Sequence, residues 1–210
     1  MDKKRGIIIL CVLVAVFIGA FIIIFNHNKY KVTETEFVID EIDLNTINDL
    51  LIGSEPPKIL YADKENVIFN SSGIFVYNMK DKALIHSFNI SSFMAGVYLD
   101  CFVLQDGEEL IFTSIEDTGN SAMAYYSYSF VNDTVKELTG KQYTDYLEKR
   151  FICESLDYQD ELYQKSSGKI ANISDDEYVY LTFEDWKVST IKIVYVNKGK
   201  ETYFNVFNDI

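Results

Sequence analysis

A run of twenty residues near the start of the chain, Gly6 to Phe25, contains no charged side chain. An α-helix rises about 1.5 Å per residue, so a helix of this length reaches roughly 30 Å, the thickness of a bilayer's hydrocarbon core. The run is longer than the ~7–15 apolar residues of a secretory signal peptide, and no small-residue cleavage site follows it. The sequence therefore predicts a transmembrane signal-anchor at residues 6–25 that contacts membrane lipid.

The charges on either side of this span predict its orientation. Lys3, Lys4 and Arg5 precede it, whereas only Lys29 and Lys31 follow it closely. Because cytoplasmic flanks carry the excess of basic residues, the N-terminus is expected in the cytoplasm and the rest of the chain outside the cell membrane. The predicted layout is a cytoplasmic stub (1–5), the single-pass anchor (6–25), a stalk and lead-in with a short helix (26–57) and a β-rich extracellular domain (58–210).

The composition favours an acidic folded domain beyond the span. The whole chain has a net charge of −13, and its 15 Tyr and 15 Phe provide large apolar side chains for a core. A negative field repels nucleic acids and anionic lipid surfaces, so no nucleic-acid partner is expected. The abundance of Ile, Asn, Lys, Asp and Tyr is typical of AT-rich bacterial genomes.

The lead-in is expected to contain a short strand at residues 37–39 and one short helix. Apolar residues with helical spacing stand at Ile47, Leu50 and Leu51. Asn45 is the expected N-cap and Gly53 the expected stop. Pro56 and Pro57 then separate the lead-in from the main body, because a Pro-Pro pair cannot continue a helix.

The main body contains three segments with one pattern, four short runs of β-branched and aromatic residues separated by Asp, Asn or Gly turns. The runs are 59–62, 66–69, 74–77 and 83–88; 99–104, 109–112, 124–130 and 134–138; and 169–173, 178–181, 190–196 and 202–207. Each segment is predicted to be a β-meander. Asp63, Asp106 and Asp175 are expected in equivalent turns of three successive meanders, unless the repeat is a chance pattern.

Each meander resembles one propeller blade, but three blades are fewer than the four to eight of closed propellers. We therefore expect a mainly β fold in which propeller-like meanders do not close. The sheets form an open stack or sandwich, or another chain completes their surface. The lead-in 37–53, the insertion described next, or another protein should cap the edge strands.

The insertion 141–165, between the second and third meanders, is expected to be one amphipathic helix. Thr139 with Gln142 matches a capping box, and Lys165 followed by Gly168 is a C-terminal signal. The apolar residues of its expected stripe are Leu147, Ile152, Leu156 and Tyr163. Such a helix would cover a sheet face or edge, or bind a partner.

No catalytic, cofactor-binding or metal-binding residue is predicted, and the chain is expected not to be an enzyme. Ser166 to Lys169 matches S-x-x-K, but the accompanying S-D-N and K-T-G motifs are missing, so this segment is interpreted as a helix cap. The Asp turns and the acidic loops 116–117 and 184–185 lack a calcium-loop pattern and are interpreted as solvated turns. His86, in an expected strand, is interpreted as a core or edge residue.

The cysteines leave one alternative open. Cys11 lies in the span, and no C-x-x-C spacing for a metal is present. Cys101 and Cys153 both lie in the predicted extracellular domain. They could form a disulfide there or remain reduced.

One resemblance rests on four short stretches, Lys58–Asp63, Val67–Phe69, Gly73–Tyr77 and Val103–Gly107. They resemble the propeller-type extracellular repeats of some Firmicute membrane proteins that are grouped with BlaR1-like regulators. The resemblance covers roughly residues 58 to 138, about two repeats. The metallopeptidase part of that family has no counterpart in this sequence, so the resemblance implies an exposed sensing or binding module.

Two functions remain as expectations. The first is a membrane-anchored extracellular binding or sensory module, without catalytic activity, for a protein partner or a small extracellular ligand. The alternative is a structural or assembly subunit that pairs through an exposed sheet edge or helix with another surface or membrane protein.

Overall fold

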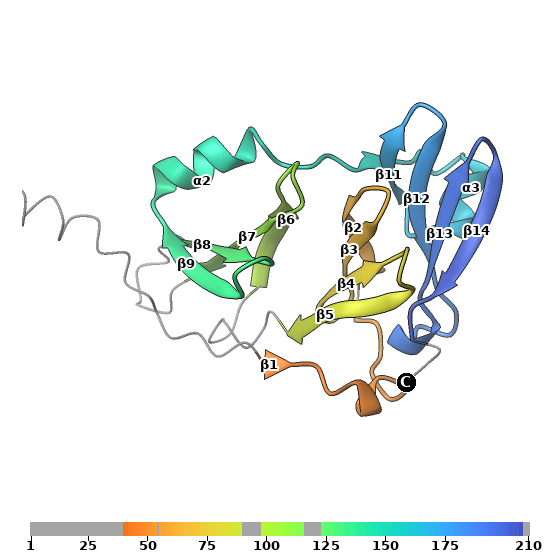
Figure 1. Ribbon diagram of the computed structural model, residues 1–210, viewed down its shortest axis with the longest axis horizontal. Coiled ribbons are helices and arrows are strands. Elements are labelled where there is room, and N and C mark those ends of the chain that lie inside the picture. The colour runs from red at the N-terminus through yellow and green to blue at the C-terminus, as the bar shows by residue number, and fades with distance from the viewer. Residues whose placement is uncertain (1–39, 54, 90–97, 116–122, 208–210) are drawn as a thin grey trace, which may run out of the picture. The chain divides into compact units, whose positions relative to one another are not determined.

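The computed structural model describes residues 40–53, 55–89, 98–115 and 123–207 (Figure 1). The chain divides into two compact units, Met1–Glu34 and Thr35–Ile210, and the described residues all belong to the second. The predicted span 6–25, the strand 37–39 and the acidic loop 116–117 lie outside the described residues. Within the described part, no helix is long and apolar enough to cross a membrane.

The described residues form three antiparallel sheets, each built on one meander, and none of the three closes on itself. The first sheet contains β2 (Lys58–Ala62), β3 (Asn66–Asn70), β4 (Ile74–Asn78) and β5 (Ala83–Asn89), with β1 (Asp40–Glu41) added beside β5. The second contains β6 (Tyr98–Val103), β7 (Glu109–Ile115), β8 (Met123–Ser129) and β9 (Thr134–Leu138). The third contains β11 (Lys169–Ser174), β12 (Glu177–Thr182), β13 (Lys192–Asn197) and β14 (Lys200–Asn205), with β10 (Glu154–Ser155) beside β11. The predicted mainly β fold with three four-stranded meanders is confirmed.

The three predicted Asp turns occupy equivalent positions. Asp63, Asp106 and Asp175 each lie between the first two strands of their meander. The Asp63 carboxylate accepts hydrogen bonds from the backbone N–H groups of Glu65 (2.7 Å) and Asn66 (2.6 Å). Asp106 accepts one from the N–H of Glu108 (3.0 Å). In these two turns, Asp therefore stabilises the reversal through local hydrogen bonds.

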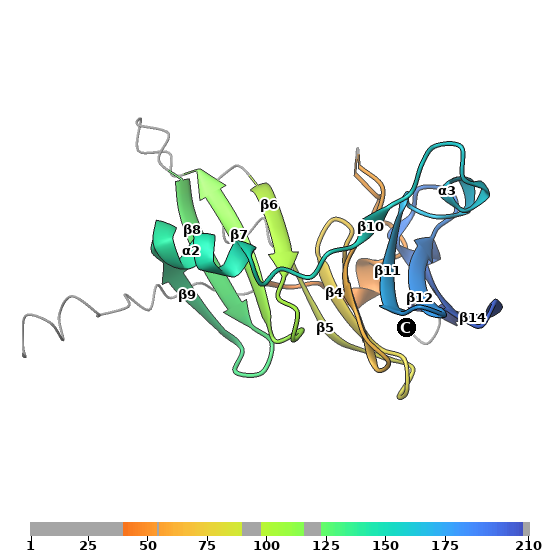
Figure 2. The same ribbon diagram turned by 90° about the horizontal axis from the view of Figure 1, so that it is seen from above.

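The first sheet is the middle layer of the unit (Figure 2). Val67 and Phe69 on β3 pack in one core with the third sheet, whereas Ile68 between them packs in another core with the second sheet. Side chains alternate along a strand, so a strand buried on both faces is apolar throughout. The sheets are therefore ordered second, first, third.

Each outer sheet is covered by a short helix on its far face. Tyr143 and Tyr146 of α2 (Gly140–Leu147) pack on a cluster of Leu104, Ile111 and Leu138 in and beside the second sheet. Leu162 of α3 (Glu161–Lys165) packs with Leu156 on Ile170, Tyr180, Val194 and Val196 of the third sheet. Both helices come from the insertion, and both cover a sheet face, which is one of the roles expected for it.

The prediction of one helix over 141–165 is wrong, although the Thr139–Gln142 capping box at its start is confirmed. The helix ends because the next residues pair with the end of β6. The N–H of Gln105 donates to the carbonyl of Lys149 (2.9 Å), and the N–H of Phe151 donates to that of Val103 (2.8 Å). The expected apolar stripe does not form one buried helical face, because Ile152, one of its residues, is 70% exposed.

The lead-in forms less helix than expected. A single 3-10 turn, Leu44–Thr46, has Asp43 as its N-cap instead of Asn45, because the Asp43 carboxylate accepts a hydrogen bond from the N–H of Asn45 (3.0 Å). Of the expected apolar face, Ile47 is buried but Leu51 is 62% exposed. The lead-in does cap an edge as expected, since β1 pairs with β5, and the insertion caps another, since β10 pairs with β11.

The first strands of the three meanders gather along one extended stretch of the insertion. This stretch bonds β6 through Phe151 and β11 through β10. Between them, the Cys153 thiol donates to the carbonyl of Ile59 on β2 (3.3 Å). Inner strands that converge in this way make the arrangement propeller-like. Cys153 is a free thiol, so it does not form the disulfide with Cys101 that the sequence left open.

Candidate functional site

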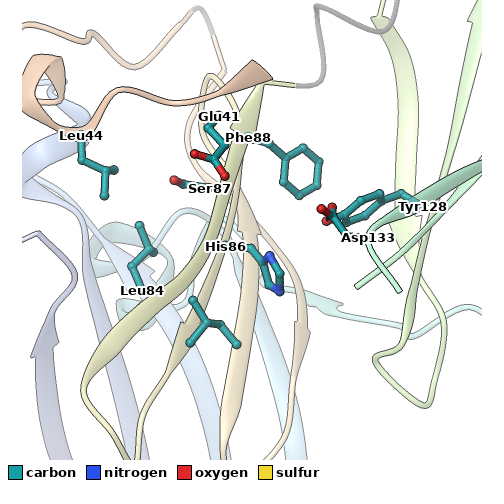
Figure 3. A pocket seen from close by; sticks show the side chains of 9 residues that line it. Glu41, Leu44, Leu84, His86, Ser87, Phe88, Tyr128 and Asp133 are labelled. Atoms are coloured by element: carbon teal, nitrogen blue, oxygen red, sulfur yellow. Dashed lines mark hydrogen bonds between the residues drawn. The ribbon is translucent and has the colours of Figure 1, made fainter. Parts of the chain in front are cut away.

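A groove runs along β5, with His86 and Phe88 on the side of the second sheet and Leu44 and Leu84 on the side of the third. One cavity of about 310 Å³ is lined by Glu41, Leu44, Leu84, Ile85, His86, Ser87, Phe88, Tyr128 and Asp133 (Figure 3). A second cavity of about 230 Å³ is lined by Tyr61, Asp63, Asn66, Ile68, Val76, Ile85, His86, Asp106, Gly107, Glu108, Phe130 and Val131. Because both are lined by Ile85 and His86, we treat them as one feature and call it the His86 groove.

An irregularity in β5 places the two shared residues. The register with β4 shifts so that Val76 faces His86 while the next residue, Tyr77, faces Leu84. Ile85 is thus an extra residue in its strand, and such a bulge redirects side chains locally. Val76 packs in the core with the second sheet, so its partner His86 lies on that side as well. Ile85 remains 49% exposed.

Aromatic rings from both sheets form one wall of the groove. The ring centroid of Phe88 on β5 lies 4.7 Å from that of Tyr128 on β8. Phe130, just after β8, stands nearly perpendicular to Tyr128 at 5.2 Å and lies 6.2 Å from the His86 ring. Edge-to-face pairs of this kind stabilise the contact beyond the area they bury. The wall therefore also holds the two sheets together.

At one end of the groove a tyrosine holds a carboxylate. The Tyr128 hydroxyl donates to Oδ1 of Asp133 (2.8 Å), which lies in the turn between β8 and β9 with φ of 52°. Burial, then this hydrogen bond and the charge of Asp133, raise the pKa of Tyr128 well above its ordinary value. The tyrosine therefore stays protonated and keeps the carboxylate at the groove wall, as Figure 3 shows.

At the other end, equivalent turns of the first two meanders meet. The Tyr61 hydroxyl donates to Oδ2 of Asp63 (2.9 Å), and burial, followed by Asp63 and the more distant charge of Asp106, raises the pKa of Tyr61. Gly107 has φ of +75°, and a Cβ on it would lie 2.6 Å from Cζ of Tyr61. Only glycine allows the β6–β7 turn to approach Tyr61 this closely.

The described residues that line the groove carry carboxylates but no lysine or arginine. The acidic ones are Glu41, Asp63, Asp106, Glu108 and Asp133, and His86 is the one basic side chain among the described lining residues. Within the described ranges, no group of three or more His, Cys, Asp or Glu side chains could hold a metal ion. Carboxylates and aromatic faces can accept hydrogen bonds and attract cations, so recognition of a positive group is what this arrangement can do.

The S-x-x-K motif, the acidic loop 184–185 and Cys153 lie outside the His86 groove. Ser166 is the C-cap of α3, and its hydroxyl accepts from the N–H of Gly168 (3.1 Å), as expected for a helix cap. Glu184 in the acidic loop 184–185 pairs with Lys192 at 2.9 Å. Burial raises the pKa of Cys153 to about 12, so its thiol stays protonated at neutral pH.

The sequence predicted Asp63 and Asp106 in equivalent turns and His86 in a strand, but it did not predict that the three line one groove. Neither the aromatic wall nor Asp133 was predicted as part of a site. One signal was present. Tyr126, Tyr128 and Phe130 recur at every second position, which places large rings on one face of a strand. Their partner on β5 depends on which sheets stack, and that order is not encoded in strand periodicity.

No known protein-family model matches the chain, and a comparison with curated proteins finds no match.

Proposed function

We propose that this chain is a membrane-anchored extracellular binding or sensory module, without catalytic activity, whose binding face is the His86 groove. The groove itself is the observation that carries the proposal. It combines an open cavity, an aromatic wall and fixed carboxylates at a junction of two sheets, and binding sites typically combine apolar walls with a few placed polar groups.

The placement at the membrane is part of the proposal and is supported by the sequence. The apolar run 6–25 would anchor the module in lipid, and the basic residues before it favour an external C-terminal domain. The resemblance to repeats of BlaR1-like membrane regulators implies the same exposed role.

Site-specific photo-crosslinking on intact cells tests the binding face. A photoreactive residue replaces Ile85, which lies in the groove and is 49% exposed, or Ile152, which is 70% exposed and lines neither cavity. We expect a discrete adduct from position 85 and none from position 152. Equal adducts from both positions would indicate collision alone and would contradict the groove as binding face.

The alternative, an assembly subunit, has one observation in its favour. Strand β14 is the last strand of the third sheet, and among the described strands it pairs only with β13. Its outer edge therefore offers unpaired backbone groups to a strand of another chain, and Tyr203 on it is 56% exposed. A photoreactive residue at Tyr203 that links to another protein, with none captured at Ile85, would favour assembly over groove binding.

A further inference from the structure

We infer that the occupant of the His86 groove is an extended basic segment of another protein, with lysine or arginine side chains in the two cavities. This inference rests on the proposed function and names the class of partner. The charge, the aromatic wall and the dimensions of the groove carry it.

Charge selects a cationic occupant. Carboxylates stand at both ends, Glu41 and Asp133 around one cavity and Asp63, Asp106 and Glu108 around the other. An anionic occupant would displace water from them and repel them, which costs free energy, and a neutral occupant would supply only uncharged donors. An ammonium or guanidinium group supplies charged donors in place of that water. Asp133 suits this role, because Tyr128 engages its Oδ1 and Oδ2 can accept a further donor.

The wall favours the side chains of lysine and arginine over a bare ion. Phe130 is half-buried and presents aromatic surface to the groove, whereas Phe88 and Tyr128 are buried behind it and hold it in place. Such rings pack against the aliphatic stem of a long basic side chain and attract its charged head. A hydrated metal ion would use neither the rings nor the apolar surface of Ile85.

The dimensions favour a peptide over a small molecule. Pockets for drug-sized ligands span roughly 300–1,000 Å³, so the two cavities, of about 310 and 230 Å³, lie at and below the lower end of that range. Each cavity is therefore suited to one or two side chains. Because they meet at Ile85 and His86, an extended backbone that crosses this point can place a basic side chain in each.

The test uses the purified full chain in detergent and a fluorescent tetralysine peptide with blocked ends, followed by anisotropy. In the double variant D133N/E41Q, the substitutions keep side-chain size and remove two charges. Asn tolerates the positive φ at position 133, and its side-chain oxygen can still accept from Tyr128. We expect affinity to fall by about tenfold or more, as for loss of charge-assisted partners.

The matched control is E137Q/E148Q, which removes two exposed carboxylates that line neither cavity. It should change affinity by less than about twofold, because exposed charges at a distance are screened by salt. Equal losses in the two variants would show that the acidic domain attracts the probe as a whole and would overturn the inference.

Two further probes separate the alternatives. Spermidine that competes as well as the peptide does would overturn a protein segment in favour of a small polyamine. A tetraglutamate peptide that binds as tightly as tetralysine would contradict charge selection. If wild-type chain bound none of these probes while position 85 still gave a discrete crosslink, the basic partner would be wrong and the proposed function would stand.

Discussion

The two faces of the first sheet differ in how they meet their neighbours. Toward the third sheet, Val67, Phe69 and Phe75 lie in one continuous core in which each is fully buried. Toward the second sheet, Ile68 and Phe88 are also buried, but the contact opens into the His86 groove along β5. One sheet thus presents a sealed face and an open face.

Charge separates the two faces as well. On the sealed side, Lys64 in the β2–β3 turn pairs with Glu177 of the third sheet at 3.4 Å. On the open side, the same turn faces Asp106 and Glu108 of the second sheet, and none of the described lysines or arginines lines the groove. Packing and a cross-sheet ion pair thus make the sealed face structural, whereas carboxylates with no lysine or arginine partner among the described residues leave the open face suited to a partner.

The largest expected effect is in the sealed core. Phe75 is fully buried, with ring centroids 5.2 Å from Phe69 and 5.4 Å from Phe207. Phe75→Ala should lower the free energy of unfolding by about 3–5 kcal/mol, the usual cost of removing a buried ring. Chemical denaturation of the full chain in detergent measures it. Phe130→Ala, in the half-buried groove wall, should cost clearly less, and equal costs would show that the faces do not differ.

The contact between the β2–β3 turn and the β6–β7 turn provides a sharper comparison, because Gly199 is a matched control for Gly107. Gly107 and Gly199 have φ of +75° and +76°, but a Cβ at Gly107 would lie against Tyr61, whereas one at Gly199 meets nothing within 4 Å. Gly107→Ala should therefore destabilise by about 1–3 kcal/mol more than Gly199→Ala, the typical cost of overpacking. Equal denaturation midpoints for the two variants would mean that the β6–β7 turn does not approach Tyr61 as described.

The smallest expected effect concerns the tyrosine that holds Asp133. Tyr128→Phe removes one hydrogen bond and should cost about 1 kcal/mol. Because the folded-state pKa of Tyr128 is raised above its ordinary value of 10.0, the unfolded chain loses this proton first as pH rises. The stability that the protonated Tyr128 contributes to the folded chain is fully present below about pH 10 and is lost as the pH rises above it.

Stability measured at about pH 9 and about pH 11 should therefore fall less in Tyr128→Phe than in the unchanged chain. Tyr158→Phe is the control, since Tyr158 is 73% exposed. If Tyr128→Phe left the pH dependence as it was, the Tyr128–Asp133 bond would not hold in solution.

The strands and their turns could be predicted from the sequence because both depend on local chemistry. Runs such as Asn66–Asn70 are β-branched and aromatic, and Asp63 and Asp106 stabilise their turns within a few residues. The continuous apolar character of β3 and β4 is also typical of strands that are buried on both faces.

The order of the sheets and the ends of the helices could not be predicted in this way. Whether the third meander packs on the first or on the second depends on long-range packing of similar apolar faces. The insertion leaves its helix after Leu147 because Lys149 and Phe151 bond to a distant strand end. The groove follows from the same stacking, so its aromatic wall was visible as a pattern on β8 but not as a site.

Hydroxyl-radical footprinting of the full chain, followed by mass spectrometry, tests most directly whether the first sheet has one sealed and one open face. Radicals oxidise aromatic and imidazole side chains according to their exposure to water. His86 and Phe130 are half-buried at the groove, whereas Phe69 and Phe75 are fully buried toward the third sheet. We predict oxidation of the first pair and protection of the second. Oxidation of Phe69 and Phe75 as fast as that of His86 would contradict the account.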